Sequence, residues 1–336
     1  MCEITIALAS ALLSCSSPIA FEQDKTQSDG STATTDDEMT KTDSIFTAKS
    51  TVGDVIADSA FGDFGRLLFP VDRNVPSSMT LAQVSTPNVY VWYSNIKVDK
   101  TVEIINYLHN EATSGKQIFY NIYSDAEISS DRTKADTGLF FFRGDKGAPF
   151  AIVNAGGGFM YVGAMHDSFP HSLELSKNKL NAFALIYRPD NPYEDLARAI
   201  EFIHDNAATL GVKADGYSLW GGSAGARMAA VLGNAAYLQQ LTARTDLPQA
   251  ASVIMQYTGY SYVSEYDAPT YVCVGKNDGI ASWQTMQQRL QQLSSLGIPT
   301  EFHAYDGLSH GFGLGTGTVA DGWINDAIKF WQKNIR

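Results

Sequence analysis

The sequence predicts an α/β protein with a doubly wound, mostly parallel sheet that follows an N-terminal extension. From Gly138 onward, short apolar runs typical of strands alternate with amphipathic stretches typical of helices, which is the pattern of a parallel sheet with crossover helices. The runs 252–257 and 269–275 are apolar almost throughout, as expected of strands covered on both faces. With 336 residues, of which 44% are hydrophobic, the chain is long enough to bury such a sheet.

The predicted elements follow one another in a regular order from Gly138 to the C-terminus. Apolar runs of strand length lie at 138–144, 149–157, 181–188, 217–220, 252–257, 269–275 and 299–305. We expect the first two strands to be neighbours. Helical spacing of apolar residues predicts helices at 193–211, from Ala224 onward, at 282–297 and at 321–335.

Residues 45–135 form the N-terminal extension and precede a core at 136–336. Three elements are expected in the extension: a strand at 89–96, a helix at 99–112 and a strand at 116–123. We interpret His109 and Asp125 as surface or capping groups. The extension carries no motif that indicates chemistry, so the functional residues are expected in the core.

Residues 1–15 have the features of an export signal. The apolar segment 4–13 is too short to span a bilayer, and the small residue Ser14 precedes Cys15. The segment resembles the lipobox of bacterial lipoproteins, in which the cysteine becomes the lipidated first residue of the mature chain. Glu3 replaces the usual basic residue before the apolar segment, so three interpretations stay open: lipidation at Cys15, simple secretion, or an apolar start without a targeting role.

Residues 16–44 are interpreted as a flexible linker. The segment is rich in Ser, Thr and Asp and has almost no large apolar residue, so burial cannot offset the entropy of ordering it. A linker behind a lipidated Cys15 would hold the folded domain away from a membrane.

Charge and cysteine content exclude some classes of protein. The net charge of −12 repels a phosphate backbone and argues against nucleic acid as a partner. Of the three cysteines, Cys2 and Cys15 lie in the N-terminal segment, so a disulfide framework is not expected. Cys273 lies within an apolar run and is expected to be a small buried hydrophobic residue.

Ser223 is the first candidate functional residue. It lies in the pattern G-x-S-x-G, between Gly221 and Gly225, after the strand 217–220 and before the helix from Ala224. The glycines permit a sharp strand-to-helix turn that exposes the serine hydroxyl beyond the carboxyl end of the strand. The pattern alone also arises by chance, but in this setting it predicts a nucleophile.

A serine hydroxyl needs a general base with a pKa near neutrality. Of the six histidines, only His310 lies on a glycine-rich loop after a strand, where the active residues of a parallel sheet gather. His303 is expected to point into packing within the preceding strand, and His109 and His204 fall in helices. His310 is therefore the predicted base.

A carboxylate at another strand end would orient the histidine. Asp278 follows the strand 269–275, whereas Asp267 precedes the same strand and is expected at the opposite edge of the sheet. Asp306 is also near the correct edge, but it shares a short loop with His310 and is less suited to face it. We therefore favour Asp278, and the chain order serine, aspartate, histidine then differs from that of trypsin and subtilisin.

A glycine run indicates an oxyanion hole, which is a pair of N–H donors that stabilise the charged oxygen of an acyl-transfer intermediate. Three successive glycines, 156–158, lie at the carboxyl end of the predicted strand 149–157, and their backbone N–H groups can approach a substrate without intervening side chains. The expected donors are the N–H of Gly157 or Gly158 and that of Ala224.

The motifs "AGGGF", "IYRP", "GGSAG", "GKND" and "SHGFG" together resemble the α/β-hydrolase superfamily. Within it they are most similar to the carboxylesterases related to hormone-sensitive lipase and to bacterial acetyl and feruloyl esterases. The resemblance covers Gly138 to the C-terminus. It implies that Ser223 is the nucleophile, His310 the base and Asp278 its orienter, with Gly157, Gly158 and Ala224 as oxyanion donors. Ala155 stands where the family usually has a histidine that supports the glycine loop.

These observations predict a serine esterase that acts on small acyl esters, among them acetyl or feruloyl esters of carbohydrate, without a metal or other cofactor. Two alternatives stay open: a serine peptidase of the prolyl-oligopeptidase type, and a hydrolase-like binding protein with an inert site. His166 and His171 are too weak a pattern for a metal site. We interpret them as residues near the mouth of the active site.

Overall fold

The computed structural model describes residues 45–335. The predicted export signal at 1–15, the lipidation of Cys15 and the linker at 16–44 lie outside the described residues. Within the described part of the chain, no helix is both long enough and apolar enough to cross a membrane.

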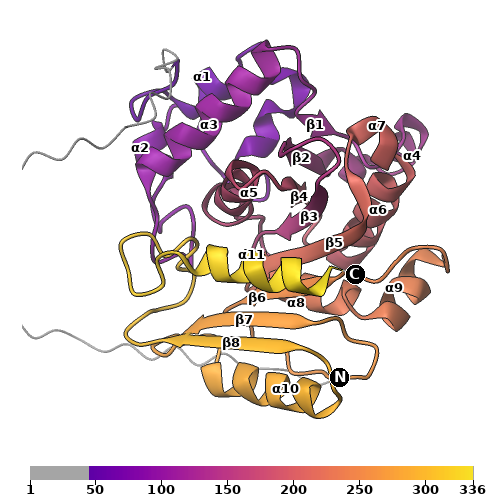
Figure 1. The fold of residues 1–336 in the computed structure, drawn as a ribbon. Coiled ribbons are helices and arrows are strands. Elements are labelled where there is room, and N and C mark those ends of the chain that lie inside the picture. The colour runs from indigo at the N-terminus through magenta and orange to yellow at the C-terminus, as the bar shows by residue number, and fades with distance from the viewer. Residues whose placement is uncertain (1–44, 336) are drawn as a thin grey trace, which may run out of the picture. The chain divides into compact units, whose positions relative to one another are not determined.

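A sheet of eight strands lies at the centre of the fold (Figure 1). In spatial order the strands are β1 (Phe119–Tyr120), β2 (Gly138–Phe142), β4 (Asn181–Ile186), β3 (Pro149–Asn154), β5 (Lys213–Gly222), β6 (Ser252–Gln256), β7 (Thr270–Gly275) and β8 (Thr300–Tyr305). β1 and β2 pair antiparallel, as do β2 and β4, and all pairs from β4 to β8 are parallel. The predicted doubly wound, mostly parallel sheet is confirmed.

The order of the first strands differs from the prediction that 138–144 and 149–157 are neighbours. β4 lies between β2 and β3, and α5 (Ser168–Lys177) carries the chain from β3 to β4. Both edges of β3 pair with parallel strands, β4 on one side and β5 on the other. No edge of β3 is left for β2, so β2 pairs antiparallel with the outer edge of β4.

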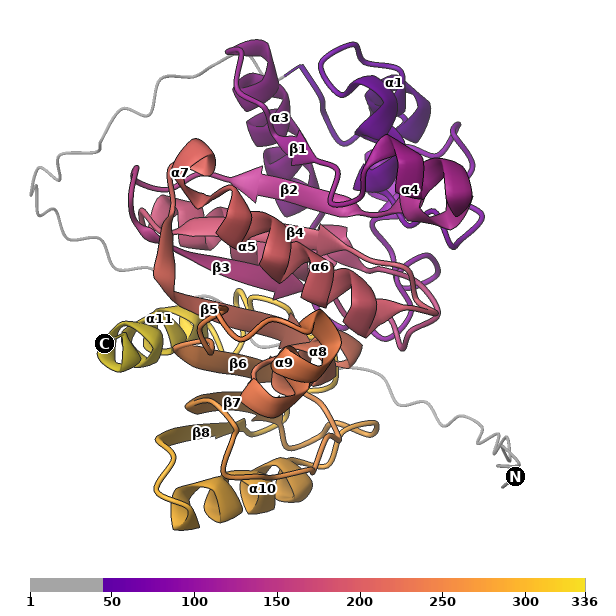
Figure 2. The same ribbon diagram turned by 90° about the vertical axis from the view of Figure 1, so that its right-hand side faces the viewer.

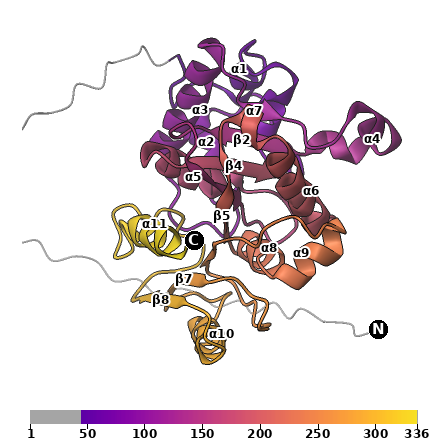
Figure 3. The ribbon, with the colours of Figure 1, turned by 45° about the vertical axis from the view of Figure 1, so that its right-hand side comes forward.

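Helices cover both faces of the sheet. Figure 3 shows α5 and α11 (Trp323–Asn334) on one side, and α6 (Pro192–Asp205), α8 (Ala224–Leu232) and α9 (Ala235–Thr242) on the other. α7 (Ala207–Leu210) is a single turn after α6, and α10 (Trp283–Ser295) packs on β7 and β8. Leu196, Ile200 and Ile203 on α6 are fully buried, because their spacing places them on one face of the helix.

The N-terminal extension lies beside α5, at the β1–β2 end of the sheet (Figure 2). Its elements are α1 (Val52–Ile56), η1 (Gly62–Leu68), α2 (Leu81–Val84), α3 (Val98–Thr113), α4 (Asp125–Ser130) and η2 (Arg132–Asp136). The helix predicted at 99–112 is confirmed as α3. Phe61, Ile104 and Leu108 belong to the same hydrophobic cluster as the strand residues Leu139 and Phe183, so the extension shares one core with the sheet.

Three predictions for the extension are wrong in detail. Residues 89–96 form turns, not a strand. The N–H groups of Val89, Tyr90 and Tyr93 bond to carbonyl oxygens three or four residues earlier, and that of Ser94 bonds to Gly311 in the core. The strand predicted at 116–123 shortens to β1, which pairs with β2 at the edge of the sheet. His109 is only 6% exposed and its Nε2 lies 3.5 Å from Asp58 Oδ1, so it is a buried group.

Candidate active site

Ser223 occupies the turn between β5 and α8, at the carboxyl end of the central strands. Its backbone has φ 52° and ψ −115°, a conformation that non-glycine residues rarely adopt. A Cβ on Gly221 would lie 2.2 Å from the carbonyl carbon of Gly225, and a Cβ on Gly225 would lie 2.0 Å from the carbonyl oxygen of Asn154. The turn can form only because Gly221 and Gly225 carry no side chain, and it leaves the serine side chain partly exposed.

The structure brings Ser223, His310 and Asp278 together from three different loops. His310 Nε2 lies 3.1 Å from Ser223 Oγ, and His310 Nδ1 lies 2.7 Å from Asp278 Oδ2. The Asp278 side chain is fully buried, and its Oδ1 accepts the backbone N–H groups of Ile280 and Ala281, both at 2.8 Å. These bonds fix the carboxylate so that it can orient the imidazole and stabilise its protonated form.

The competing aspartates do not reach His310. The Asp306 side chain is 86% exposed and pairs with Lys276 at 2.9 Å. Asp267 is buried near the start of β7, where it pairs with Arg289 at 3.1 Å. Asp278 is therefore the aspartate that faces the imidazole.

The glycine run lies beside the Ser223 turn. Gly157 has φ +132°, and a Cβ there would lie 2.0 Å from the carbonyl oxygen of Tyr161, so only glycine fits. Gly157 and Ser223 line one small cavity. The N–H groups of Gly157 and Ala224 make no hydrogen bond within residues 45–335, which leaves them available as donors to a substrate oxygen.

Solved structures with the same architecture were found by comparison. An acetyl ester-xyloside bifunctional hydrolase from Caldicellulosiruptor lactoaceticus superposes with a TM-score of 0.56 at 20% identity, over 64% of this chain and 95% of that one. A carboxylesterase from Lactobacillus plantarum WCFS1 gives a TM-score of 0.51 at 16% identity, over 60% and 94% of the two chains. The chain has the α/β-hydrolase fold. An α/β hydrolase from a Medee basin deep-sea metagenome library agrees, with a TM-score of 0.50 at 20% identity over 59% of this chain and 92% of that chain. No protein-family model and no curated protein matches the sequence.

Asp167 supports the glycine run of this α/β-hydrolase fold from behind, and sequence reasoning missed it. Its side chain is fully buried, and Oδ2 accepts the N–H of Gly156 at 2.8 Å and the hydroxyl of Tyr93 at 3.0 Å. His171 Nδ1 lies 3.3 Å from Oδ1. One feature of the sequence could have indicated this residue: Asp167 is the only acidic residue between Asp145 and Glu174.

The two histidines interpreted as mouth residues are both buried. His171 is 1% exposed beside Asp167, so it lies behind the glycine run and not at the mouth. His166 is 7% exposed, and burial lowers its pKa to about 3, which keeps the imidazole neutral. The described residues contain no group of three His, Cys, Asp or Glu side chains arranged to hold a metal ion.

A second support for the glycine run acts at Ala155, the residue directly before it. The hydroxyl of Tyr187 donates to the carbonyl oxygen of Ala155 at 2.8 Å, and both residues are buried. Burial also raises the pKa of the Tyr187 phenol, so the phenol stays protonated and remains a donor. Tyr187 and Asp167 therefore hold the start of the glycine run through two hydrogen bonds, one to Ala155 and one from Gly156.

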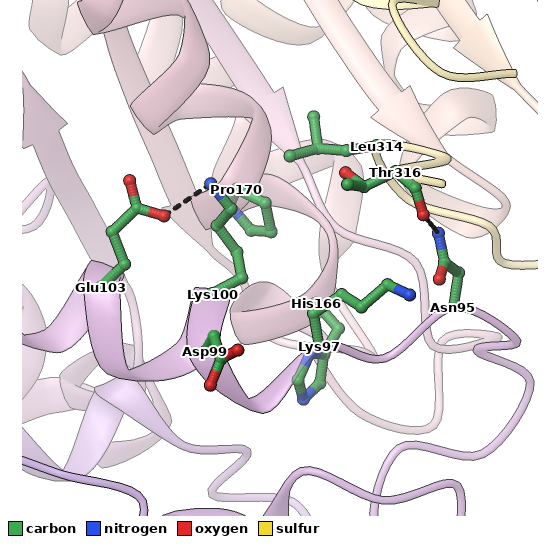
Figure 4. Close-up of a pocket in the computed structure, with 9 residues that line it drawn as sticks. All are labelled: Asn95, Lys97, Asp99, Lys100, Glu103, His166, Pro170, Leu314 and Thr316. Atoms are coloured by element: carbon green, nitrogen blue, oxygen red, sulfur yellow. Dashed lines mark hydrogen bonds and ion pairs between the residues drawn. The ribbon is translucent and has the colours of Figure 1, made fainter. Parts of the chain in front are cut away.

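Several pockets within residues 45–335 are larger than the cavity at Ser223. One, of about 250 Å³, lies between the start of α3, the segment around His166 and residues 314–316 (Figure 4). In it Lys100 pairs with Glu103, and the Asn95 amide donates to the carbonyl oxygen of Thr316. None of the predicted catalytic residues lines this pocket.

A second pocket is a groove of about 380 Å³ on the α6, α8 and α9 side of the sheet. Aromatic residues dominate its lining, which includes Tyr193, Tyr237, Tyr260, Tyr262 and Arg227. Arg227, which lines the groove, follows the nucleophile by one helical turn, and its N–H donates to the carbonyl oxygen of Ser223. We call it the tyrosine groove.

Proposed function

We propose that the chain is a serine esterase that hydrolyses small acyl esters through Ser223, His310 and Asp278. One observation carries the proposal: the hydroxyl, the imidazole and a buried carboxylate form a continuous series, with separations of 3.1 Å and 2.7 Å. Structural neighbours that are esterases support the same reaction class.

In the proposed reaction, Ser223 Oγ attacks the ester carbonyl while His310 Nε2 takes the hydroxyl proton. The N–H groups of Gly157 and Ala224 stabilise the oxyanion, and one such donor contributes about 3 kcal/mol in comparable sites. The imidazolium then protonates the leaving alkoxide. Water, deprotonated by the same imidazole, attacks the acyl-enzyme and releases the acid and free Ser223.

For the alcohol part of the substrate we propose a carbohydrate, with an acetyl or feruloyl group as the ester. The tyrosine groove supports this choice, because flat aromatic faces with hydroxyl groups at their edges suit a ring that is apolar on its faces and polar at its rim. Arg227 and Gln240 in the same lining add donors for ring hydroxyls.

The test combines covalent labelling with a substrate panel. A fluorophosphonate that carries a methyl group on phosphorus should add one phosphonyl group to the folded protein, measured by intact mass, and none to the Ser223→Ala variant. p-Nitrophenyl acetate and acetylated xylose should be hydrolysed, while peptide anilides should not. Absence of labelling would favour the inert binding protein, and cleavage of anilides without ester hydrolysis would favour the peptidase.

We also propose that the chain is exported and carries a lipid at Cys15, on the basis of the apolar segment at 4–13 and the small residue before the cysteine. Expression of the full chain in a bacterium fed with labelled palmitate should place the label in the membrane-bound protein. The Cys15→Ser variant should lose it. An unlabelled protein that is released with a shortened N-terminus would indicate simple secretion.

A further inference from the structure

Residues 90–94 of the N-terminal extension lie across the entrance to the site, and we call them the bridge segment. Trp92 and Tyr93 from this segment line the cavity at Ser223, together with Gly157, Tyr257, His310 and Gly311. The extension, which carries no catalytic motif, therefore supplies part of the wall around the nucleophile.

Hydrogen bonds hold the bridge segment to both sides of the site. On one side, the Tyr161 hydroxyl donates to the carbonyl oxygen of Val91 at 2.6 Å, and Tyr93 donates to Asp167 behind the glycine run. On the other side, the N–H of Ser94 donates to the carbonyl oxygen of Gly311 at 3.0 Å. The segment thus connects the glycine loop with the His310 loop.

Close packing fixes the position of Trp92. A Cβ on Gly158 would lie 2.9 Å from the Trp92 ring, and a Cβ on Gly311 would lie 2.1 Å from the Trp92 carbonyl oxygen. The ring also stacks on Tyr161, with centroids 6.2 Å apart. Trp92 itself has φ +75°, which is rare for a bulky residue. The neighbouring loops therefore hold the Trp92 ring over the cavity despite a strained backbone.

The cavity that remains at Ser223 has a volume of about 10 Å³, which is roughly the space that one water-sized group needs. A methyl group has about this size, whereas a longer acyl chain or a feruloyl ring would have to displace Trp92 or Tyr93. Tyr93 cannot move freely, because it is 6% exposed and bonded to buried Asp167.

We propose that the bridge segment limits the esterase to acetyl esters, with Trp92 as the residue that sets the acyl size. This inference rests on the proposed function. The acetyl methyl group occupies the cavity under Trp92, and the alcohol part of the ester extends away from it. The extension at 45–135 therefore determines specificity, while the core supplies the reacting groups.

The experiment compares the full chain with Trp92→Gly on p-nitrophenyl acetate, butyrate and hexanoate. Glycine accepts φ +75° without strain, and Trp92 is 40% exposed, so the variant should fold. The native chain should favour acetate over butyrate by at least about 100-fold in kcat/KM, since each added methylene must displace packed side chains. In Trp92→Gly this preference should fall by about 10-fold or more.

Met160→Ala is the matched control. Met160 is 66% exposed and follows the glycine run, but it does not line the cavity, so its removal should leave the acetate preference unchanged. Equal rates on acetate and hexanoate in the native chain, or the same preference in Trp92→Gly, would overturn the inference. Hydrolysis of no ester at all, with no phosphonyl label on Ser223, would instead overturn the proposed function. Circular dichroism melting checks that each variant is folded.

Discussion

Asp278 and Asp306 follow adjacent strands of the sheet, yet their surroundings give them opposite properties. Asp278 is buried and accepts two backbone N–H groups as well as contacting His310. Asp306 is almost fully exposed and pairs with Lys276, where solvent screens the interaction. Position after a strand made both residues candidates, and in the structure burial and the contact with His310 distinguish Asp278 from Asp306.

Asp278 and Asp306 provide a matched test of the carboxylate that orients His310. Asp278→Asn should lower kcat for p-nitrophenyl acetate by about ten-thousandfold, because the amide stabilises the wrong imidazole tautomer and does not balance the imidazolium. Asp306→Asn should leave kcat unchanged. Steady-state kinetics on both purified variants measures the contrast, and equal losses would show that Asp278 has no special role.

Asp167 acts on the site through the glycine run and not through contact with His310. Asp167→Ala leaves the N–H of Gly156 and the hydroxyl of Tyr93 without their shared acceptor. Because the neighbouring Gly157 N–H then loses its fixed direction, kcat should fall by about 100-fold while KM stays nearly constant.

Asp167→Asn serves as the control for this prediction, because the amide keeps one oxygen that can accept from Gly156 and Tyr93. Asp167→Asn should therefore retain most of the kcat that Asp167→Ala loses. If both variants melt at lower temperature but keep the native kcat, Asp167 stabilises the fold without positioning the loop.

At the scale of elements, the parts of the site that the sequence predicts are those that follow strands. Ser223, Asp278 and His310 each lie just after an apolar run, and the parallel topology brings such loops to one edge. The bridge segment could not be predicted, because "VYVWYSNI" has the composition of a strand. Its N–H groups at Tyr90 and Tyr93 instead close local turns, while the carbonyl of Val91 and the N–H of Ser94 bond to Tyr161 and Gly311, which are distant in sequence. The role of Asp167 could not be predicted either, because its hydrogen-bond partners Gly156 and Tyr93 are brought to it by the tertiary fold.

The shape of the glycine loop can be tested by adding one methyl group. In Gly157→Ala, the new Cβ would meet the carbonyl oxygen of Tyr161 at 2.0 Å, so the loop must shift and its N–H group must move away from the substrate oxygen. kcat should fall by about 100-fold or more.

Gly147→Ala is the control for backbone strain. Gly147 also has a positive φ, at +79°, but a Cβ there would meet no atom within 4 Å. This variant should lose about 1 kcal/mol of stability and keep its kcat. A Gly157→Ala enzyme with native kcat would show that this N–H does not bind the oxyanion.

For the whole molecule, one hydrophobic cluster extends from the N-terminal helices through the sheet to α11. Phe46 and Val55 belong to it, as do Phe330 and Trp331 near the other end of the described chain. The extension is therefore part of the folding unit, which explains how a loop from residues 90–94 can be held rigidly over a site built from residues 154–311.

The same core makes stability depend on pH through His166. An unfolded chain binds a proton at this residue below a pKa of 6.5, whereas burial lowers the folded pKa to about 3. Between these values the unfolded state binds more protons, so the free energy of unfolding decreases as the pH falls through 6.5 and stops decreasing near 3.

Urea unfolding of the full chain should therefore show that His166 removes about 2 kcal/mol of stability between about pH 7 and about pH 5. His166→Phe keeps an aromatic ring against Tyr90, whose centroid lies 4.2 Å from that of His166, but it cannot bind a proton. The variant should lose about 2 kcal/mol less than the native chain over this interval. Most carboxylates stay ionised throughout it, and His204 contributes equally to both proteins, so the difference isolates His166. Identical pH dependence in the two proteins would show that His166 can be protonated within the folded core.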